Sequence, residues 1–149
     1  MASEAGDILA KHIKSVIAKS ATKIMEYAQE NHRFTTRTGA LERSVKKEIA
    51  ADGFSAVVFL DEDEAAYAPM VHAGTKSHMI YPKYKKVLRW SGGDGFVFAK
   101  RVKHPGTKPD EFLFKAADAT KDEIQGVVDA ETEKAAQEIA AQMVKDVMK

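Results

Sequence analysis

Residues 76–108 hold the side chains with the most chemical character, because lysines and arginines alternate there with aromatic rings. Nine basic residues and one acidic residue give this segment a net charge of +8. Cations neutralise phosphates and rings stack on bases, so one interpretation is a surface that binds nucleic acid. A two-stranded ribbon gives the same alternation without a ligand, and the sequence favours this second interpretation. The buried face of that ribbon would hold Val87, Trp90, Phe96 and Phe98.

The histidines and acidic residues do not follow the spacing of known metal sites. His72, His78 and His104 match no standard zinc spacing, and no paired carboxylates accompany them in residues 76–108. The acidic run at 61–64 lacks the glycine and the terminal glutamate of an EF-hand loop. We therefore expect no metal and no cofactor. The histidines should have ordinary surface or hydrogen-bonding roles, and the acidic run should form a solvated turn.

Motifs of catalysis are missing from the sequence. The chain has no cysteine, which excludes a disulfide, a thiolate zinc site, an iron–sulfur cluster and a cysteine nucleophile. It also contains no phosphate-binding or dinucleotide-binding glycine motif, no H-E-x-x-H and no G-x-S-x-G. We predict that the protein is not an enzyme. A small hydrolase with an unrecognised site is the enzymatic alternative, and no residue supports it.

Charge is segregated along the chain, although the whole chain carries only +1. The net charge is −2 over residues 1–75, +8 over residues 76–108 and −5 over residues 109–149. These segments could be complementary faces for self-association, or a phosphate-facing patch balanced by a solvated helix. No apolar run approaches the roughly 20 residues that cross a bilayer, and residues 1–10 do not resemble a signal peptide. We expect no membrane contact and assembly in a bacterial cytoplasm.

Hydrophobic periodicity indicates the elements of the first half of the chain. Apolar residues recur every three or four positions from about Asp7 to His32, which predicts a long helix that packs across a sheet. Alternation predicts strands near 44–50 and 54–60. Asp52-Gly53 between them predicts a type I′ turn, which needs positive φ at both residues.

The second half is expected to contain a short helix, a hairpin and two further helices. A helix at 65–73 should end at Gly74, and a hairpin of strands 86–90 and 96–102 should have a mobile glycine-rich tip. Pro109 should be the first residue of a helix that reaches about residue 119. Thr120 and Glu123 form a capping-box pattern for a separate C-terminal helix. Its thin apolar face would comprise Ile124, Val127, Val128, Ile139, Met143 and Val147.

We therefore expect an α+β fold, with residues 1–119 as one domain and residues 120–149 as its C-terminal helical extension. Residues 76–108 should form an extended hairpin arm that is more ordered in the assembly than in the free protein, with the acidic C-terminal region of a neighbouring copy as its partner. Gly39, Gly74 and Gly106 are expected to be critical for the backbone. The candidate contacts with a subunit or another partner are Lys83, Lys85, Lys86, Arg89, Trp90, Phe96, Phe98, Lys100 and Arg101.

An ordered series of motifs covers about residues 36–117. The motifs are TGALERS at 38–44, YAPMVHAGT at 67–75, HMIYPK at 78–83, VLRW at 87–90, VFAK at 97–100 and HPGTKPDEFL at 104–113. This series resembles the minor tail, neck and tail-completion proteins of tailed bacteriophages. The chain departs from the family pattern at Ala73, where an aromatic or acidic residue is expected, and at Glu111, where a second proline is common.

The resemblance implies a long helix against a small, mainly antiparallel sheet, and a structural rather than catalytic role. It implies a place in the virion, in a head–tail joining ring between the capsid portal and the tail tube. The ring would be a homo-oligomer of six or twelve copies that contacts other neck and tail proteins. Non-specific contact with packaged DNA is a further expectation. A DNA- or RNA-binding module that uses residues 76–108 remains the alternative function.

Overall fold

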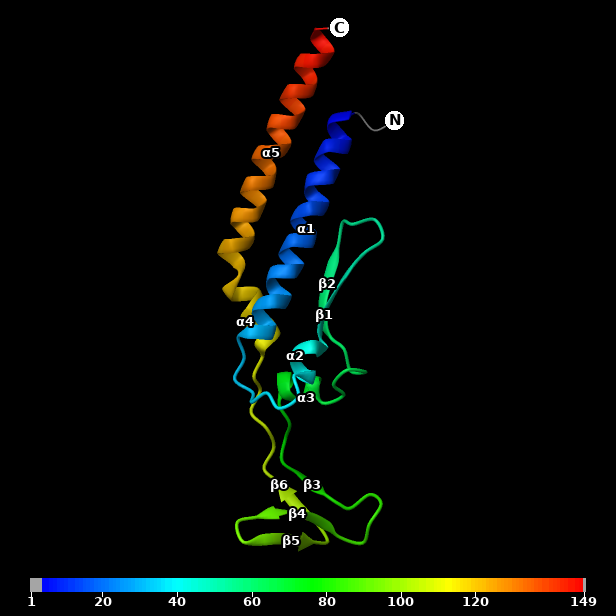
Figure 1. Cartoon of the computed structure of the whole chain (residues 1–149), viewed down its shortest axis with the longest axis vertical. Helices are drawn as coiled ribbons and strands as arrows, with labels where there is room; N and C mark the ends of the chain where they lie inside the picture. The colour runs from blue at the N-terminus through cyan, green and yellow to red at the C-terminus, as the bar shows by residue number, and fades with distance from the viewer. Residues whose placement is uncertain (1–3, 149) are drawn as a thin grey trace.

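The computed structural model describes residues 4–148, which form an elongated molecule with two long helices at one end and an arm at the other (Figure 1). Helix α1 (Glu4–Glu30) and helix α5 (Lys121–Val147) lie side by side in opposite directions. A small mixed region of short helices and one hairpin lies beside the lower part of α1. The α+β fold with a long N-terminal helix, small antiparallel sheets and C-terminal helices is confirmed.

Helix α1 contacts two different structures along its length. One side packs against α5, and another packs against the hairpin of β1 (Val45–Ile49) and β2 (Ala56–Leu60). Its buried residues include Ala21 and Ala28, whose small side chains allow the neighbouring elements to approach. The prediction of one long helix that packs on a small sheet is therefore confirmed, with its start three residues earlier than expected.

The β1–β2 hairpin has a longer loop than the sequence predicts. The N–H of Gly53 donates to the carbonyl of Ala50 at 2.8 Å, and the N–H of Ala50 donates to the carbonyl of Ser55 at 2.9 Å. Gly53 has φ +76°, whereas Asp52 does not have positive φ. The type I′ turn is therefore wrong. Asp52 instead accepts a hydrogen bond on Oδ1 from the N–H of Phe54 at 2.9 Å, which stabilises the wider loop.

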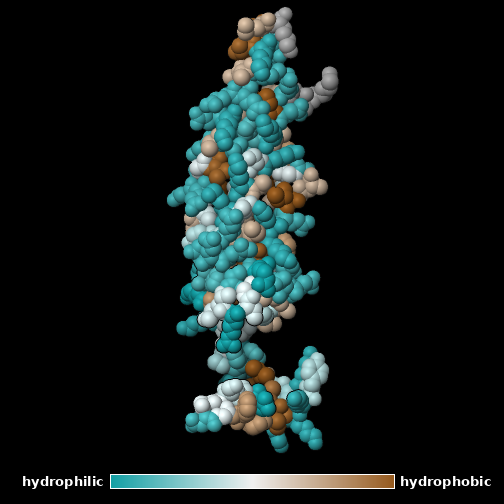
Figure 2. All heavy atoms as spheres, viewed as in Figure 1, coloured by the Kyte–Doolittle hydropathy of each residue, from teal (hydrophilic) through white to brown (hydrophobic). Residues whose placement is uncertain are grey.

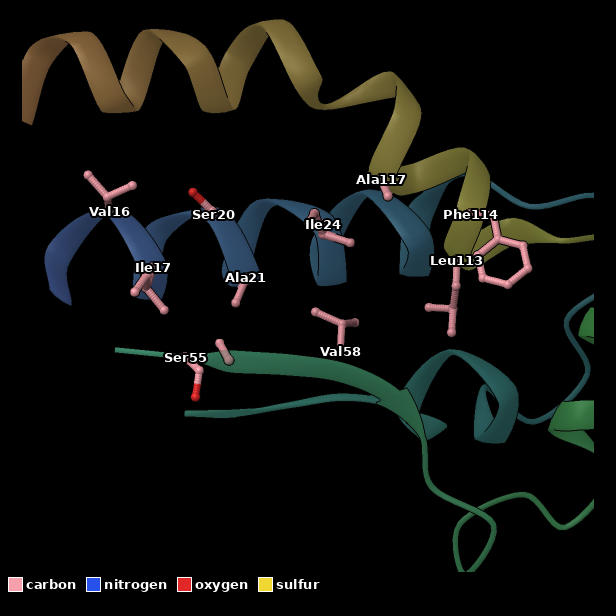
Figure 3. A pocket seen from close by; sticks show the side chains of 11 residues that line it. Val16, Ile17, Ser20, Ala21, Ile24, Ser55, Val58, Leu113, Phe114 and Ala117 are labelled. Atoms are coloured by element: carbon pink, nitrogen blue, oxygen red, sulfur yellow. The ribbon is translucent and has the colours of Figure 1, made fainter. Parts of the chain in front are cut away.

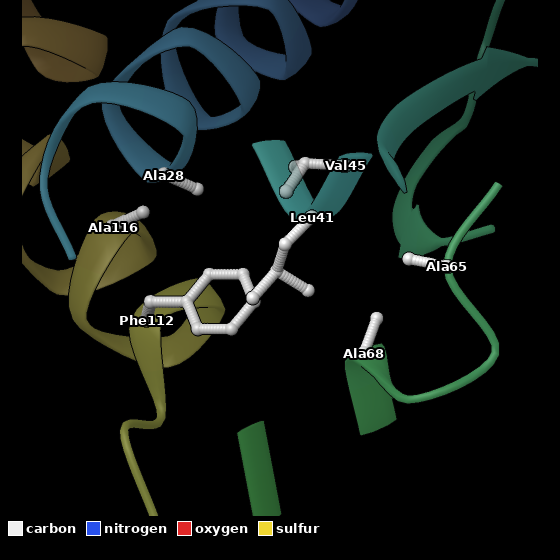
Figure 4. Close-up of a cluster of buried hydrophobic side chains, with 7 residues drawn as sticks. All are labelled: Ala28, Leu41, Val45, Ala65, Ala68, Phe112 and Ala116. Carbon is white, nitrogen blue, oxygen red and sulfur yellow. The ribbon is translucent and has the colours of Figure 1, made fainter. Parts of the chain in front are cut away.

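The hydrophobic core is small and lies where the short helices meet the lower end of α1. It joins α2 (Ala40–Ser44), α3 (Ala68–Ala73) and α4 (Phe112–Ala119) to α1 and β1. Phe112 is fully buried and is the largest residue of the cluster. Its ring makes edge contacts with Phe34 at 5.3 Å and with His72 at 5.2 Å between centroids. The remaining core residues are mostly alanines, and Figure 4 shows the cluster: Ala28, Leu41, Val45, Ala65, Ala68, Phe112 and Ala116.

The arm consists of two small antiparallel sheets. β3 (His78–Ile80) pairs with β6 (Val102–His104) near the body, and β4 (Leu88–Gly92) pairs with β5 (Gly95–Ala99) at the far end. The single strand predicted over residues 96–102 is wrong. The chain leaves the β4–β5 sheet after Ala99, and residues 102–104 pair with β3 in the other sheet. The arm extends away from the helices in Figure 1.

The start of α4 differs from the prediction. Pro109 is not helical, because the main-chain N–H groups of Asp110 and Glu111 donate to the carbonyls of Val71 and His72, at 3.1 and 3.0 Å. Glu111 has φ +51°. The proline ring fixes φ near −65° and has no N–H, so proline at position 111 could not adopt this conformation.

Helix α5 is a separate helix that begins after Thr120 as predicted, but its N-terminal cap and its apolar face differ from the prediction. The hydroxyl of Thr120 donates to the carbonyl of Ala116 at 2.8 Å and does not cap α5, so the capping box is wrong. Ile124 and Ile139 are half-buried against α1, whereas Met143 and Val147 are exposed. Figure 1 gives the reason, because the last turns of α5 extend past the beginning of α1.

Candidate subunit interface

Two glycines form the root of the arm, where its two chains leave the body. Thr75 and Thr107 exchange main-chain hydrogen bonds of 2.9 and 3.0 Å, and Gly74 and Gly106 flank this bridge with φ +73° and +91°. A Cβ on Gly106 would lie 2.2 Å from the carbonyl oxygen of Thr75, and one on Gly74 would lie 2.6 Å from that of Thr107. The predicted backbone conformations of Gly74 and Gly106, which are unfavourable for a residue with a Cβ, are confirmed. Gly39, the third glycine expected to be critical, has φ +70° at the start of α2.

The β4–β5 ribbon exposes apolar side chains on both of its faces. Trp90 pairs with Val97, and Arg89 pairs with Phe98, so Trp90 and Phe98 lie on opposite faces. The exposed fractions are 42% for Trp90, 58% for Phe96 and 60% for Phe98. The predicted single buried face is therefore wrong, because the ribbon projects from the molecule and has no core beneath it. Val87 lies outside the strand and is also exposed.

The basic residues of the arm have no acidic partner of their own. Within the described residues, no lysine or arginine of segment 76–108 forms an ion pair. The guanidinium of Arg89 instead lies 4.0 Å from the ring centroid of Phe96, a cation–π contact. Lys83 lies 5.6 Å from the ring of Tyr84. Lys85 and Lys86 are exposed before β4, and Lys100 and Arg101 are exposed between β5 and β6.

The arm therefore brings the candidate contact residues together on one projecting structure. Figure 2 shows apolar and strongly hydrophilic residues next to each other on the arm, beyond its narrow root. Burial of the apolar side chains of this surface against a partner would be favourable, and its positive charge would select an acidic partner. Its chemistry suits binding, because its cations and rings are not arranged around an enclosed cavity.

The histidines of this region have structural contacts. His78 and His104 pair across β3 and β6 with ring centroids 5.1 Å apart, and the N–H of Gly106 donates to Nδ1 of His104 at 3.1 Å. His72 contacts the rings of Phe112 and Phe114, and burial lowers its pKa below the ordinary value. Across residues 4–148, no three histidine or carboxylate side chains are grouped so as to hold a metal ion.

The acidic run at 61–64 forms a turn after β2. The N–H of Asp63 donates to Oδ1 of Asp61 at 3.0 Å, and Lys46 donates to the same carboxylate. The hydrogen bond from Lys46 lowers the pKa of Asp61 below its usual value. Arg43 pairs with Glu64 at 2.8 Å. These contacts connect the turn to α2 and β1, which gives the run a structural role.

Two polar clusters in the body were not anticipated from the sequence. Oδ2 of Asp110, a buried residue, accepts the main-chain N–H groups of Arg33 and Phe34 at 2.8 and 3.3 Å. Between the long helices, His12 contacts Glu131 and Glu138 at 2.7 and 3.0 Å. The only signal for the second cluster was a histidine at helical spacing within the apolar stripe of α1.

Comparison with protein-family models, with curated proteins and with solved structures finds no match to this chain. No helix within residues 4–148 is both long enough and apolar enough to span a membrane.

Proposed function

We propose that the protein is a structural component of a tailed-phage virion, part of the neck or tail-completion ring that joins the head to the tail. The observation that carries this proposal is the projecting arm, with exposed aromatic side chains on both faces and basic side chains that form no ion pair within residues 4–148. The ordered sequence motifs supply the phage assignment, since they resemble those of minor tail and neck proteins. The proposal involves no catalysis, no cofactor and no membrane.

The apolar surface of the arm supports a role in assembly. Trp90, Phe96 and Phe98 each leave roughly half of their surface in water, although aromatic side chains contribute strongly to the stability of cores and interfaces. Exposed apolar surface of this extent usually marks a contact with another macromolecule. Assembly into a ring would provide such a contact, because the exposed surfaces of each subunit become buried against neighbouring copies or against adjoining virion proteins.

The distribution of charge supports contacts between unlike surfaces. The arm segment carries +8 and the whole chain +1, so the rest of the chain carries −7. Contacts between copies that use two different patches are heterologous and can close into a ring. A basic arm and an acidic body are two such patches, and their attraction would select the orientation of neighbouring copies.

A DNA-binding module is the second candidate function, and the exposure of the arm favours it specifically. The buried-face explanation of the basic and aromatic alternation is wrong, so rings and cations are both accessible. A nucleic-acid ligand would release counterions, so affinity would fall steeply with salt. Binding of the isolated chain to single- and double-stranded DNA should be measured at two salt concentrations, with Phe96→Ala and Phe98→Ala as variants. Strong, salt-sensitive and ring-dependent binding would favour this alternative.

The proposed function is tested by deleting the gene from the phage that encodes it. Heads and tails should accumulate without joining, or tails should remain unfinished, and plasmid expression of the chain should restore infectious particles. A complementing plasmid that encodes Trp90→Ser with Phe98→Ser should fail, whereas one that encodes Tyr84→Ser should succeed, since Tyr84 is exposed on the arm outside its strands. Normal infectious particles from the clean deletion would contradict the proposal.

A further inference from the structure

An apolar groove runs along the body beside strand β2. Its volume is about 520 Å³, and α1, α4 and the β2 region form its walls (Figure 3). Every lining residue is uncharged, and Ile17, Ile24, Leu113 and Phe114 are among them. Phe114 is 65% exposed, so the groove is open to water along this wall.

The free edge of β2 borders this groove. The strand residues that line it, Ala56 and Val58, belong to β2, and no lining residue belongs to β1. The opposite wall comes from α4. The groove therefore lies on the side of β2 that faces away from its partner strand.

The main chain of β2 can accept another strand at this edge. The bonds that flank the ladder, from Ala50 to Ser55 and from Asp61 to Ser44, show that the odd-numbered residues of this segment pair with β1. The even-numbered residues therefore direct their N–H and C=O groups to the free edge. β2 has the sequence AVVFL and lacks the lysines or proline that usually protect an exposed edge.

Strand β5 has the features that this site requires. Its sequence is GFVFA, with three successive exposed apolar side chains, no charge and no proline, and its outer edge is unpaired within the described residues. The arm to which it belongs is basic, whereas the rest of the chain carries −7. The arm leaves the body at the end opposite the free ends of the long helices and extends away from the groove in Figure 1, so it does not reach its own groove.

We infer that β5 of one copy docks on β2 of a second copy, adding a strand to its sheet and placing apolar side chains in the groove between α1 and α4. This inference rests on the self-association in the proposed function and names the surfaces that form the contact. The α4 wall lies within the acidic C-terminal region, residues 109–149, that the sequence suggested as partner. Main-chain pairing would supply affinity, and the groove would select apolar side chains.

The absence of cysteine permits a direct cross-linking test on the full chain. One sample carries Ala99→Cys at the end of β5, and a second, distinguished by a mass tag, carries Ala117→Cys in the groove. After mixing, a short bismaleimide should join the two kinds of chain into a heterodimer. The matched control is Ala136→Cys, an exposed alanine on α5 that does not line the groove, which should give at least about tenfold less product.

A second measurement covers the case in which the linker geometry is unfavourable. Sedimentation up to about 1 mM chain should show self-association that Phe96→Ser with Phe98→Ser weakens at least about tenfold, and that Tyr84→Ser leaves unchanged. These residues are exposed, so the variants should fold normally. Equal cross-linking of Ala117→Cys and Ala136→Cys, exclusive arm-to-arm cross-links, or a chain that stays monomeric would overturn the inference. The gene deletion tests the proposed function separately. If the chains cross-link as expected but the deletion phage is normal, the docking of β5 on β2 would stand and the role in the phage particle would be contradicted.

Discussion

Nδ1 of His12 lies 2.7 Å from Oε2 of Glu131, across the contact between α1 and α5, and the side chains are only 9% and 6% exposed. Nε2 of His12 lies 3.0 Å from Oε2 of Glu138. An ionised carboxylate only accepts hydrogen bonds, so both ring nitrogens must donate and the ring must be the imidazolium. The two long helices are thus joined by a charged clamp, to which Lys19 adds a contact with Glu131 at 2.6 Å.

The clamp predicts how helix pairing depends on pH. Hydrogen bonds with Glu138 and Glu131 raise the pKa of His12 above 6.5, so its contribution is complete below pH 6.5 and is lost as pH rises through the raised value. Hydrogen bonds from Lys19 and His12 lower the pKa of Glu131 from 4.5 to about 2, so its contribution is present above pH 4.5 and is lost as pH falls toward 2. The contribution of the clamp should be greatest between about pH 4.5 and 6.5.

Thermal unfolding followed by circular dichroism at pH 5.5 and pH 8.5 checks this prediction. The wild-type chain should lose more stability between the two values than His12→Gln, which cannot titrate. His78→Gln serves as the control, because His78 is exposed on the arm, where its side chain contacts the carbonyl of Lys76 and the ring of His104 and is remote from the long helices. An NMR titration that places the pKa of His12 below 6.5 would contradict the assignment of the imidazolium.

Asp110 should contribute strongly to the stability of the body. Burial tends to raise its pKa, but hydrogen bonds from the main chain and side chain of Arg33 and from Lys115 outweigh it, so the pKa is lowered. Asp110→Ala would leave the main-chain N–H of Arg33 unpaired and should reduce the free energy of unfolding by about 1–3 kcal/mol. Chemical denaturation measures the change, with Asp129→Ala on exposed α5 as the control. A change in the free energy of unfolding no larger than that of Asp129→Ala would contradict a stabilising role for Asp110.

The glycines at the root of the arm should not tolerate a side chain. Gly106→Val should reduce stability or assembly by about 1–3 kcal/mol, because its φ is positive and a Cβ would collide with the Thr75 carbonyl. Gly74→Val should behave similarly. Gly93→Val is the matched control at the tip of the arm, where a Cβ meets no atom within 4 Å. Denaturation and sedimentation should separate the three variants, and equal behaviour would mean that the root is not constrained.

The arm should gain protection when copies assemble. Amide hydrogen exchange at residues 86–101 should be slower in the assembly than in the monomer, since the contact would pair main-chain groups that water now reaches. Charge reversal at Lys85, Lys86 and Arg89 should weaken assembly, and more so at low salt, where charges are less screened. Equal exchange in both states, together with indifference to these reversals, would make the arm an independent part of the fold.

The sequence was most informative where local patterns decide the structure. Periodicity predicted α1 and the β1–β2 strands, and glycine positions predicted the left-handed residues at the root of the arm. Prediction from the sequence failed where groups distant along the chain form hydrogen bonds with the backbone. Pro109 is an ordinary helix start by local rules, but the next two N–H groups bond to the end of α3, so the helix begins at Phe112.

The candidate site was predicted in position but not in detail. A basic, glycine-tipped arm follows from composition, but the distribution of Trp90 and Phe98 on opposite faces depends on the strand register. The His12–Glu131 clamp depends on the alignment of helices whose residues lie 119 positions apart. The groove beside β2 depends on the packing of α4 against α1, for which the sequence gives no local signal.

The copy number of this chain in purified phage particles tests the central claim most directly. Quantitative mass spectrometry should compare this chain with the portal protein of the same particles. A ring at the neck predicts a fixed small number of copies per particle, six or twelve by the family resemblance, that does not change with salt washing or nuclease treatment. Absence from the particles, or an amount that falls when DNA is removed, would contradict a structural role in the virion.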